Sequence, residues 1–123
     1  DYAAQPFGKT LLDCLKEQGK HVYAIGAIND IFAHRGITNP IHAAELPNLW
    51  DATIKAMQEA PEDSLIFTNF EDFDHTREQV PVLCFGKNIT PQDLGQRVTY
   101  ADLGQTVADY LQIAPLTFGT SFK

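Results

Sequence analysis

Short apolar runs alternate with segments of helical periodicity along this chain, and that alternation limits the folds open to it. The runs at 21–26, 64–70 and 80–86 have the length and composition of buried strands. Apolar stripes at helical spacing follow residue 10, residue 48 and residue 99. Helices between buried strands predict an α/β fold, layered α/β/α, with a mostly parallel sheet and a single domain over residues 1–123.

Local signals predict where the helices begin. Thr10, Asn48 and Thr99 each precede an apolar stripe and have an Asp three residues later, which is a variant of the capping box. We expect residues 27–36 to form a loop and residues 114–123 to be irregular. The strands at 64–70 and 80–86 are joined almost directly, although neighbouring parallel strands need a long crossover connection.

Composition excludes some partners. The net charge is −7, which argues against binding to nucleic acids and to anionic membrane surfaces, since both need clustered Lys and Arg. A phosphorylated substrate remains compatible, because one local cationic pocket is enough for it. The sequence has no run long and apolar enough to cross a membrane. Cys14 and Cys84 lie in apolar segments without metal-type spacing, which is typical of reduced cysteines in a cytoplasmic protein.

One charged cluster has the composition of a metal site. Asp72, Asp74 and His75 follow the strand predicted at 64–70, and functional groups collect at the carboxyl ends of parallel strands. Carboxylates with an imidazole suit a divalent cation such as Mn²⁺. On composition alone a solvated charged turn is the favoured explanation, since short clusters of Asp and His are common, and no second cluster of this quality supplies further ligands.

The other polar candidates are weaker. Asn29 and Asp30 follow the strand at 21–26 and a glycine, so they could face a site or satisfy their own backbone in a turn. We interpret His21, His34 and His42 as surface residues. The sequence contains no glycine-rich phosphate loop and no nucleophile triad, and it predicts no catalytic residue in this chain.

Several strings resemble motifs of one enzyme family. Residues 74–83 read DHTREQVPVL, residues 67–74 read FTNFEDFD, and residues 26–33 read GAINDIFA before GIT at 36–38. Further along the chain come LGQR and ADLGQT. In this order, the strings are similar to motifs of phosphopentomutases, which move a phosphate between C1 and C5 of ribose or deoxyribose.

That resemblance implies an alkaline-phosphatase-like core, two Mn²⁺ ions, a phosphorylated threonine and a phosphorylated pentose substrate. By position it implies that Asp74 and His75 are metal ligands, and that Asp72 and Arg77 are additional or neighbouring metal-site residues. Asp74 matches two family motifs that a long stretch normally separates, so an internal stretch is missing here. The cap domain, the N-terminal part of the core and the threonine nucleophile are also missing.

Two substitutions depart from the family pattern: Ala27 stands at a Lys position and Glu71 at a Val position. We therefore expect the chain to be part of a phosphopentomutase that is inactive alone. A shortened or engineered non-catalytic α/β domain is the alternative, and a small metal-binding or interaction module that uses Asp72, Asp74 and His75 is a third. Removing a strand–helix unit leaves sheet edges unpaired, so self-association is a further expectation.

Overall fold

The computed structural model describes residues 4–70, 82 and 89–123. Its centre is a sheet of three parallel strands, β1 (Val22–Ile25), β2 (Asn39–Ile41) and β3 (Leu65–Thr68), in the order β2-β1-β3. Mixed helices and parallel strands confirm the predicted α/β class. The strands predicted at 21–26 and 64–70 are β1 and β3, whereas the one at 80–86 lies outside the described residues except for the exposed Val82.

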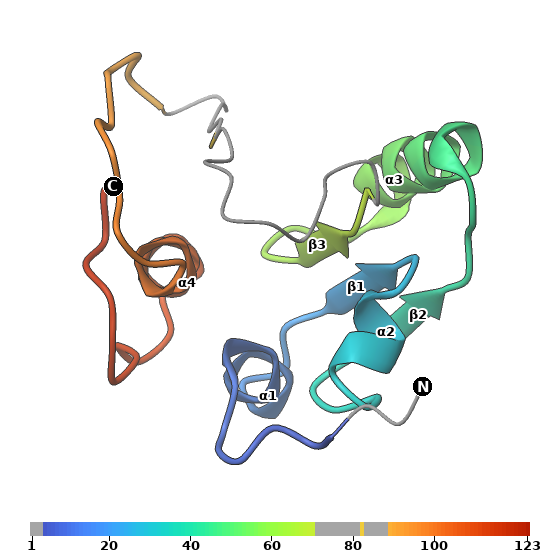
Figure 1. Cartoon of the computed structure of the whole chain (residues 1–123), viewed down its shortest axis with the longest axis horizontal. Helices are drawn as coiled ribbons and strands as arrows, with labels where there is room; N and C mark the ends of the chain where they lie inside the picture. The colour runs from blue at the N-terminus through green and yellow to red at the C-terminus, as the bar shows by residue number, and fades with distance from the viewer. Residues whose placement is uncertain (1–3, 71–81, 83–88) are drawn as a thin grey trace.

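The central strand β1 separates two hydrophobic clusters, because successive side chains of a strand point to opposite faces. Val22 and Ala24 belong to one cluster, and Ile25 belongs to the other with Tyr23 packed against it. The first cluster includes residues of three helices, α1 (Leu11–Glu17), α2 (Ile28–Ile31) and α4 (Ala101–Tyr110). The second includes Leu49 and Ala56 of α3 (Leu46–Glu59). The sheet therefore lies between two helical layers (Figure 1).

The first helix begins where the sequence predicted. The Thr10 hydroxyl accepts a hydrogen bond from the Asp13 N–H, and the Asp13 carboxylate accepts one from the Thr10 N–H, which completes a capping box. Leu12 and Leu15 are buried against β1. Burying a leucine of this kind stabilises the fold by about 1.5–3 kcal/mol. The helix ends just before Gly19, also as predicted.

The structure makes four corrections to the local predictions, one of which is a strand that was missed. Residues 27–36, expected to be a loop, contain the single turn of α2, which is too short for periodicity to reveal. Strand β2 was not predicted because it has three residues and includes Pro40, which an edge strand tolerates. Helix α3 begins before Asn48, since Pro47 fits its first turn, and Asn48 therefore caps nothing.

The start of α4 is the fourth correction. Tyr100 occupies the N-cap, while Thr99 accepts a hydrogen bond from the N–H of Ala101. Asp102 turns away from the cap and accepts a hydrogen bond from the N–H of Thr120 instead. The tail 114–123 has no helix or strand, as predicted. Among the helices of the described residues, none is both long and apolar enough to cross a membrane.

Candidate functional site at the carboxyl edge of the sheet

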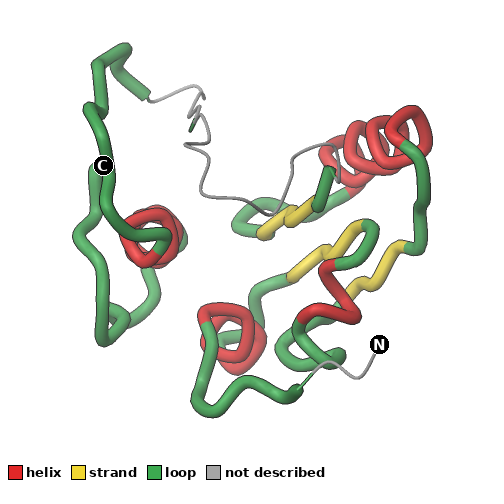
Figure 2. Tube along the Cα trace, in the orientation of Figure 1, coloured by secondary structure: helices red, strands yellow, loops and turns green. Residues whose placement is uncertain are grey.

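The two connections between strands run on opposite faces of the sheet. From β1 the chain passes through α2 to β2 on one side, and from β2 it crosses through α3 to β3 on the other (Figure 2). Where an open parallel sheet reverses its winding in this way, the loops separate at the carboxyl ends of the strands and leave a crevice. The order of the strands in the sheet thus places a candidate binding crevice at this edge.

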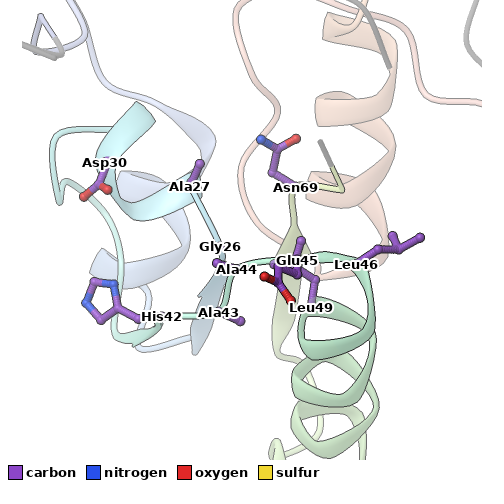
Figure 3. A pocket seen from close by; sticks show the side chains of 10 residues that line it. All are labelled: Gly26, Ala27, Asp30, His42, Ala43, Ala44, Glu45, Leu46, Leu49 and Asn69. Carbon is purple, nitrogen blue, oxygen red and sulfur yellow. The ribbon is translucent and has the colours of Figure 1, made fainter. Parts of the chain in front are cut away.

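A pocket of about 710 Å³ occupies that edge. All three strands contribute to its lining through the residues that follow them, and Figure 3 shows Asp30 and His42 on one side and Asn69, at the end of β3, on the other. The lining residues are Gly26, Ala27, Asp30, His42, Ala43, Ala44, Glu45, Leu46, Leu49 and Asn69.

Backbone hydrogen bonds hold the three strand ends together. The N–H of Gly26 donates to the Ile41 carbonyl over 3.1 Å, and the N–H of Asn69 donates to the Ile25 carbonyl over 3.3 Å. Gly26 has φ +73°, and a Cβ atom there would lie 2.8 Å from Cδ2 of Leu49. Only glycine meets both conditions without strain, so Gly26 lets α3 approach the end of β1 closely.

The polar part of the lining is acidic. Asp30, Glu45 and His42 are exposed, Asn69 is half-buried, and the lining residues that the structure describes include no Lys or Arg. Ala27, where the resembled family pattern has Lys, is one of these lining residues. Two carboxylates repel a phosphate dianion, so the described part of the pocket needs an added cation before it can hold one.

The donors present suit a hard or borderline divalent cation in kind, since they are carboxylate, amide and imidazole groups. They fall short in number. Within residues 4–70, 82 and 89–123, no three His, Cys, Asp or Glu side chains lie close enough together to hold a metal ion. A complete centre at this edge therefore requires ligands from outside the described residues.

The predicted metal-site residues, Asp72, Asp74, His75 and Arg77, lie outside the described residues, as do Glu71 and Cys84. Asp72 is only three residues after Asn69, which lines the pocket. In the sequence, the predicted metal-site residues therefore follow closely after a residue of the pocket lining. Their roles as ligands stay a prediction.

Of the weaker candidates, Asp30 lines the pocket, whereas Asn29 is buried and its amide is paired with His34. His21 is exposed at the opposite end of β1, as predicted. His42 is exposed but also lines the pocket, which the sequence interpretation missed. A prediction of β2 would have found it, because His42 directly follows that strand.

Comparison with known proteins agrees with the motifs. No protein-family model matches the chain. The phosphopentomutase of Legionella pneumophila (strain Lens) is 38% identical over 175 residues, which cover 99% of this chain and 43% of that protein. Those of Elusimicrobium minutum and Shewanella loihica are 38% and 34% identical, with 99% of this chain and 44% and 43% of each relative covered.

The length of the match also carries information. The match to the Legionella protein extends over 175 positions, whereas the chain has 123 residues, so at least 52 positions within that matched region have no counterpart here. This agrees with the internal stretch that the fused motifs indicated. Over the segment that it spans, the chain is therefore similar to phosphopentomutases, matching them along nearly its whole length while covering less than half of theirs.

Proposed function

We propose that this chain is part of a phosphopentomutase, and that it retains a partial divalent-cation site at the carboxyl edge of its sheet without the capacity to catalyse phosphoryl transfer alone. The whole enzyme would interconvert ribose 1-phosphate and ribose 5-phosphate, or their deoxy forms. The observation that carries the proposal is the pocket between three parallel strand ends, from whose wall at Asn69 the chain continues into the DHTRE-like motif.

In the proposed site, Asp74 and His75 bind a Mn²⁺ ion, with Asp72 and Arg77 beside them. A bound divalent cation supplies the positive charge that offsets the oxygens of a phosphoryl group in flight. Asp30 and Glu45 add negative charge around the pocket, which favours cation binding over direct phosphate binding. Substrate phosphate would therefore enter only after the cation.

We do not expect the chain to catalyse phosphoryl transfer alone. The chain spans about 43% of the length of the curated relatives it matches. The name of these relatives, phosphopentomutase, supports an isomerase of phosphorylated pentoses for the whole protein.

Isothermal titration of the full chain with Mn²⁺ tests the site. We expect weak binding that His75→Ala abolishes and that decreases in acid, because protons compete for the ligands. His21→Ala is the matched control, since His21 lies at the opposite end of β1 and should not affect the binding. Equal Mn²⁺ affinity in the parent chain and His75→Ala would contradict the proposal.

A second assay distinguishes the family reaction from the non-catalytic domain that is the alternative. The chain is incubated with ribose 1-phosphate, Mn²⁺ and a bisphosphate activator, beside a full-length relative. Turnover by the relative and none by the chain is expected. Turnover by the chain would show that the segment it spans is sufficient, and inactivity of the full-length relative would remove the family assignment of function.

A further inference from the structure

The pocket at the carboxyl edge of the sheet is rich in hydrogen-bond acceptors. A Cβ atom placed on Gly26 would lie 3.4 Å from the carbonyl oxygen of Asn69 and 3.8 Å from that of Ala43, so both oxygens border the space above Gly26. The carboxylates of Asp30, on α2, and Glu45, at the N-cap of α3, add acceptors to the same lining (Figure 3). Ionised carboxylates and carbonyl oxygens accept hydrogen bonds and donate none. The described lining therefore suits a ligand that donates hydrogen bonds.

The backbone donors that an anion would need at this edge are already in use. The N–H groups of Gly26 and Asn69 both donate to carbonyl oxygens of neighbouring strand ends. Phosphate sites at the carboxyl edge of a parallel sheet use free N–H groups and the start of a helix. Here Pro47 removes an N–H from the first turn of α3, and the carboxylate of Glu45 belongs to the residue directly before that helix. The described lining is thus poorly suited to direct phosphate binding.

Among the described residues, no Lys or Arg side chain neutralises the two carboxylates. None of the ion pairs formed within residues 4–70, 82 and 89–123 includes Asp30 or Glu45. They repel a phosphate dianion but not a neutral ligand. A hydroxyl group that donates to a carboxylate forms a charge-assisted hydrogen bond, which is stronger than one between neutral groups. The charge of the lining therefore favours neutral hydroxyl compounds.

The apolar part of the lining leaves room for a compact ligand. Ala27, Ala43 and Ala44 have small side chains, and the volume of about 710 Å³ is typical of small-molecule sites. A sugar ring combines C–H groups, which can contact such apolar atoms, with hydroxyl groups that donate hydrogen bonds. His42 and Asn69 each carry groups that donate and accept, so they fit hydroxyl groups and a ring oxygen.

We propose that the described lining of this pocket binds the hydroxyl groups of a neutral sugar, with Asp30 and Glu45 as acceptors, and does not contact the phosphate of the substrate. The choice of a pentose as the sugar rests on the proposed function, whereas the preference for hydroxyl groups follows from the lining itself. The site is thereby divided: the lining holds the sugar, and the phosphate depends on the added cation.

NMR titrations of the full chain with D-ribose and with ribose 5-phosphate, both in EDTA, test this division. We expect D-ribose to bind with shifts centred on the pocket amides. Ribose 5-phosphate should bind about fivefold or more weakly, because the two carboxylates repel its phosphate. Absence of ribose binding, or ribose 5-phosphate binding at least as tightly, would overturn the inference. Tighter binding of ethylammonium than of ribose would also overturn it, since the pocket would then take a cationic ligand.

Asp30→Asn predicts opposite effects on the two ligands, which a merely structural role would not produce. The substitution removes a charge and keeps the shape, so ribose should bind about threefold or more weakly and ribose 5-phosphate more tightly. Glu62→Gln is the matched control, because it removes the same charge from an exposed residue just before the amino end of β3. Changes of the same sign for both ligands in Asp30→Asn, or equal changes in Glu62→Gln, would contradict the inference.

Titration calorimetry with Mn²⁺ in place of EDTA separates this inference from the proposed cation site. If that site exists, ribose 5-phosphate should gain affinity relative to ribose when Mn²⁺ is added. No gain, with ribose still preferred in EDTA, would support the sugar-binding lining and contradict the cation site alone. A gain without a preference for ribose in EDTA would overturn only the sugar-binding lining.

Discussion

Arg35 and Asp13 connect three segments of the chain at the scale of single residues. The Arg35 guanidinium donates to the Asp13 carboxylate over 2.8 Å and to the Pro6 carbonyl over 2.8 Å. Partial burial raises the pKa of Asp13, but hydrogen bonds from Thr10 and the nearby Arg35 charge outweigh it and lower the net pKa below its ordinary value of 3.8. Asp13 therefore stabilises the fold in its ionised form.

Asp13→Asn should lower the free energy of unfolding by about 1–3 kcal/mol at neutral pH, because it removes a charged partner from Arg35 and from the helix cap. Because folding lowers the pKa of Asp13, its carboxylate makes its full contribution to the free energy of unfolding above the unfolded pKa, about 3.9. That contribution is lost as the pH falls through the pKa of the folded state. Urea unfolding at neutral and acid pH should show the two proteins converging in acid.

Glu17→Gln is the control for that experiment. Glu17 is on the same helix, and its ion pair with Lys9 is exposed on both sides, so its loss should lower stability far less than Asp13→Asn does. Equal losses from Asp13→Asn and Glu17→Gln would contradict the role given to Asp13.

Ala27 is the residue at which the pocket departs from the resembled family pattern. Ala27→Lys puts a cation in the lining, beside Asp30 and Glu45, and should strengthen binding of inorganic phosphate several-fold. Ala114→Lys adds the same charge in the exposed tail and should have no such effect. Phosphorus NMR titration measures both. Equal phosphate binding by the two variants would show that position 27 is not a phosphate contact.

At the scale of elements, α4 holds the end of the chain by polar side chains rather than by apolar packing alone. Asp102 accepts a hydrogen bond from the N–H of Thr120, and Gln105 accepts one from the N–H of Leu116. The Thr106 hydroxyl accepts one from the N–H of Phe122. The ADLGQT string, which resembles a family motif, therefore has a structural role in the described residues: it satisfies the backbone of a tail that has no sheet partner.

The close approach of α3 to the end of β1 gives an element-scale prediction. Gly26→Ala forces a side chain into positive φ, which costs about 1–2 kcal/mol, and also places Cβ against Leu49. Gly19→Ala has nearly the same φ, +74°, but meets no atom within 4 Å. Thermal unfolding should therefore show a larger loss for Gly26→Ala. Identical losses would mean that α3 moves aside without cost.

At the scale of the whole molecule, β1 is the element that both hydrophobic clusters share. Val22 and Ala24 pack with Leu12, Leu15 and Ala108 on one side, and Ile25 packs with α3 on the other. Disturbing either face therefore disturbs the strand on which the other depends. This arrangement supports the predicted single domain, which stays a prediction until its cooperativity is measured.

Leu15→Ala tests that cooperativity. Leu15 is fully buried, so the substitution should cost about 2–5 kcal/mol. Because β1 is shared, Trp50 fluorescence on the opposite face should report the same shift in urea midpoint as far-UV circular dichroism. Leu103→Ala, at a side chain that is 44% exposed, is the control and should cost much less. Two separate transitions would contradict a single domain.

The sequence by itself determined the α/β class, β1, β3, the cap of α1 and the family resemblance, because these depend on local periodicity, neighbouring residues and ordered motifs. Only the tertiary structure decided that Pro40 lies in a strand, and that Asp30, His42 and Asn69 share one pocket. Those residues lie after three different strands, and the sheet order that brings the strand ends together depends on pairing between distant segments, which no local pattern encodes.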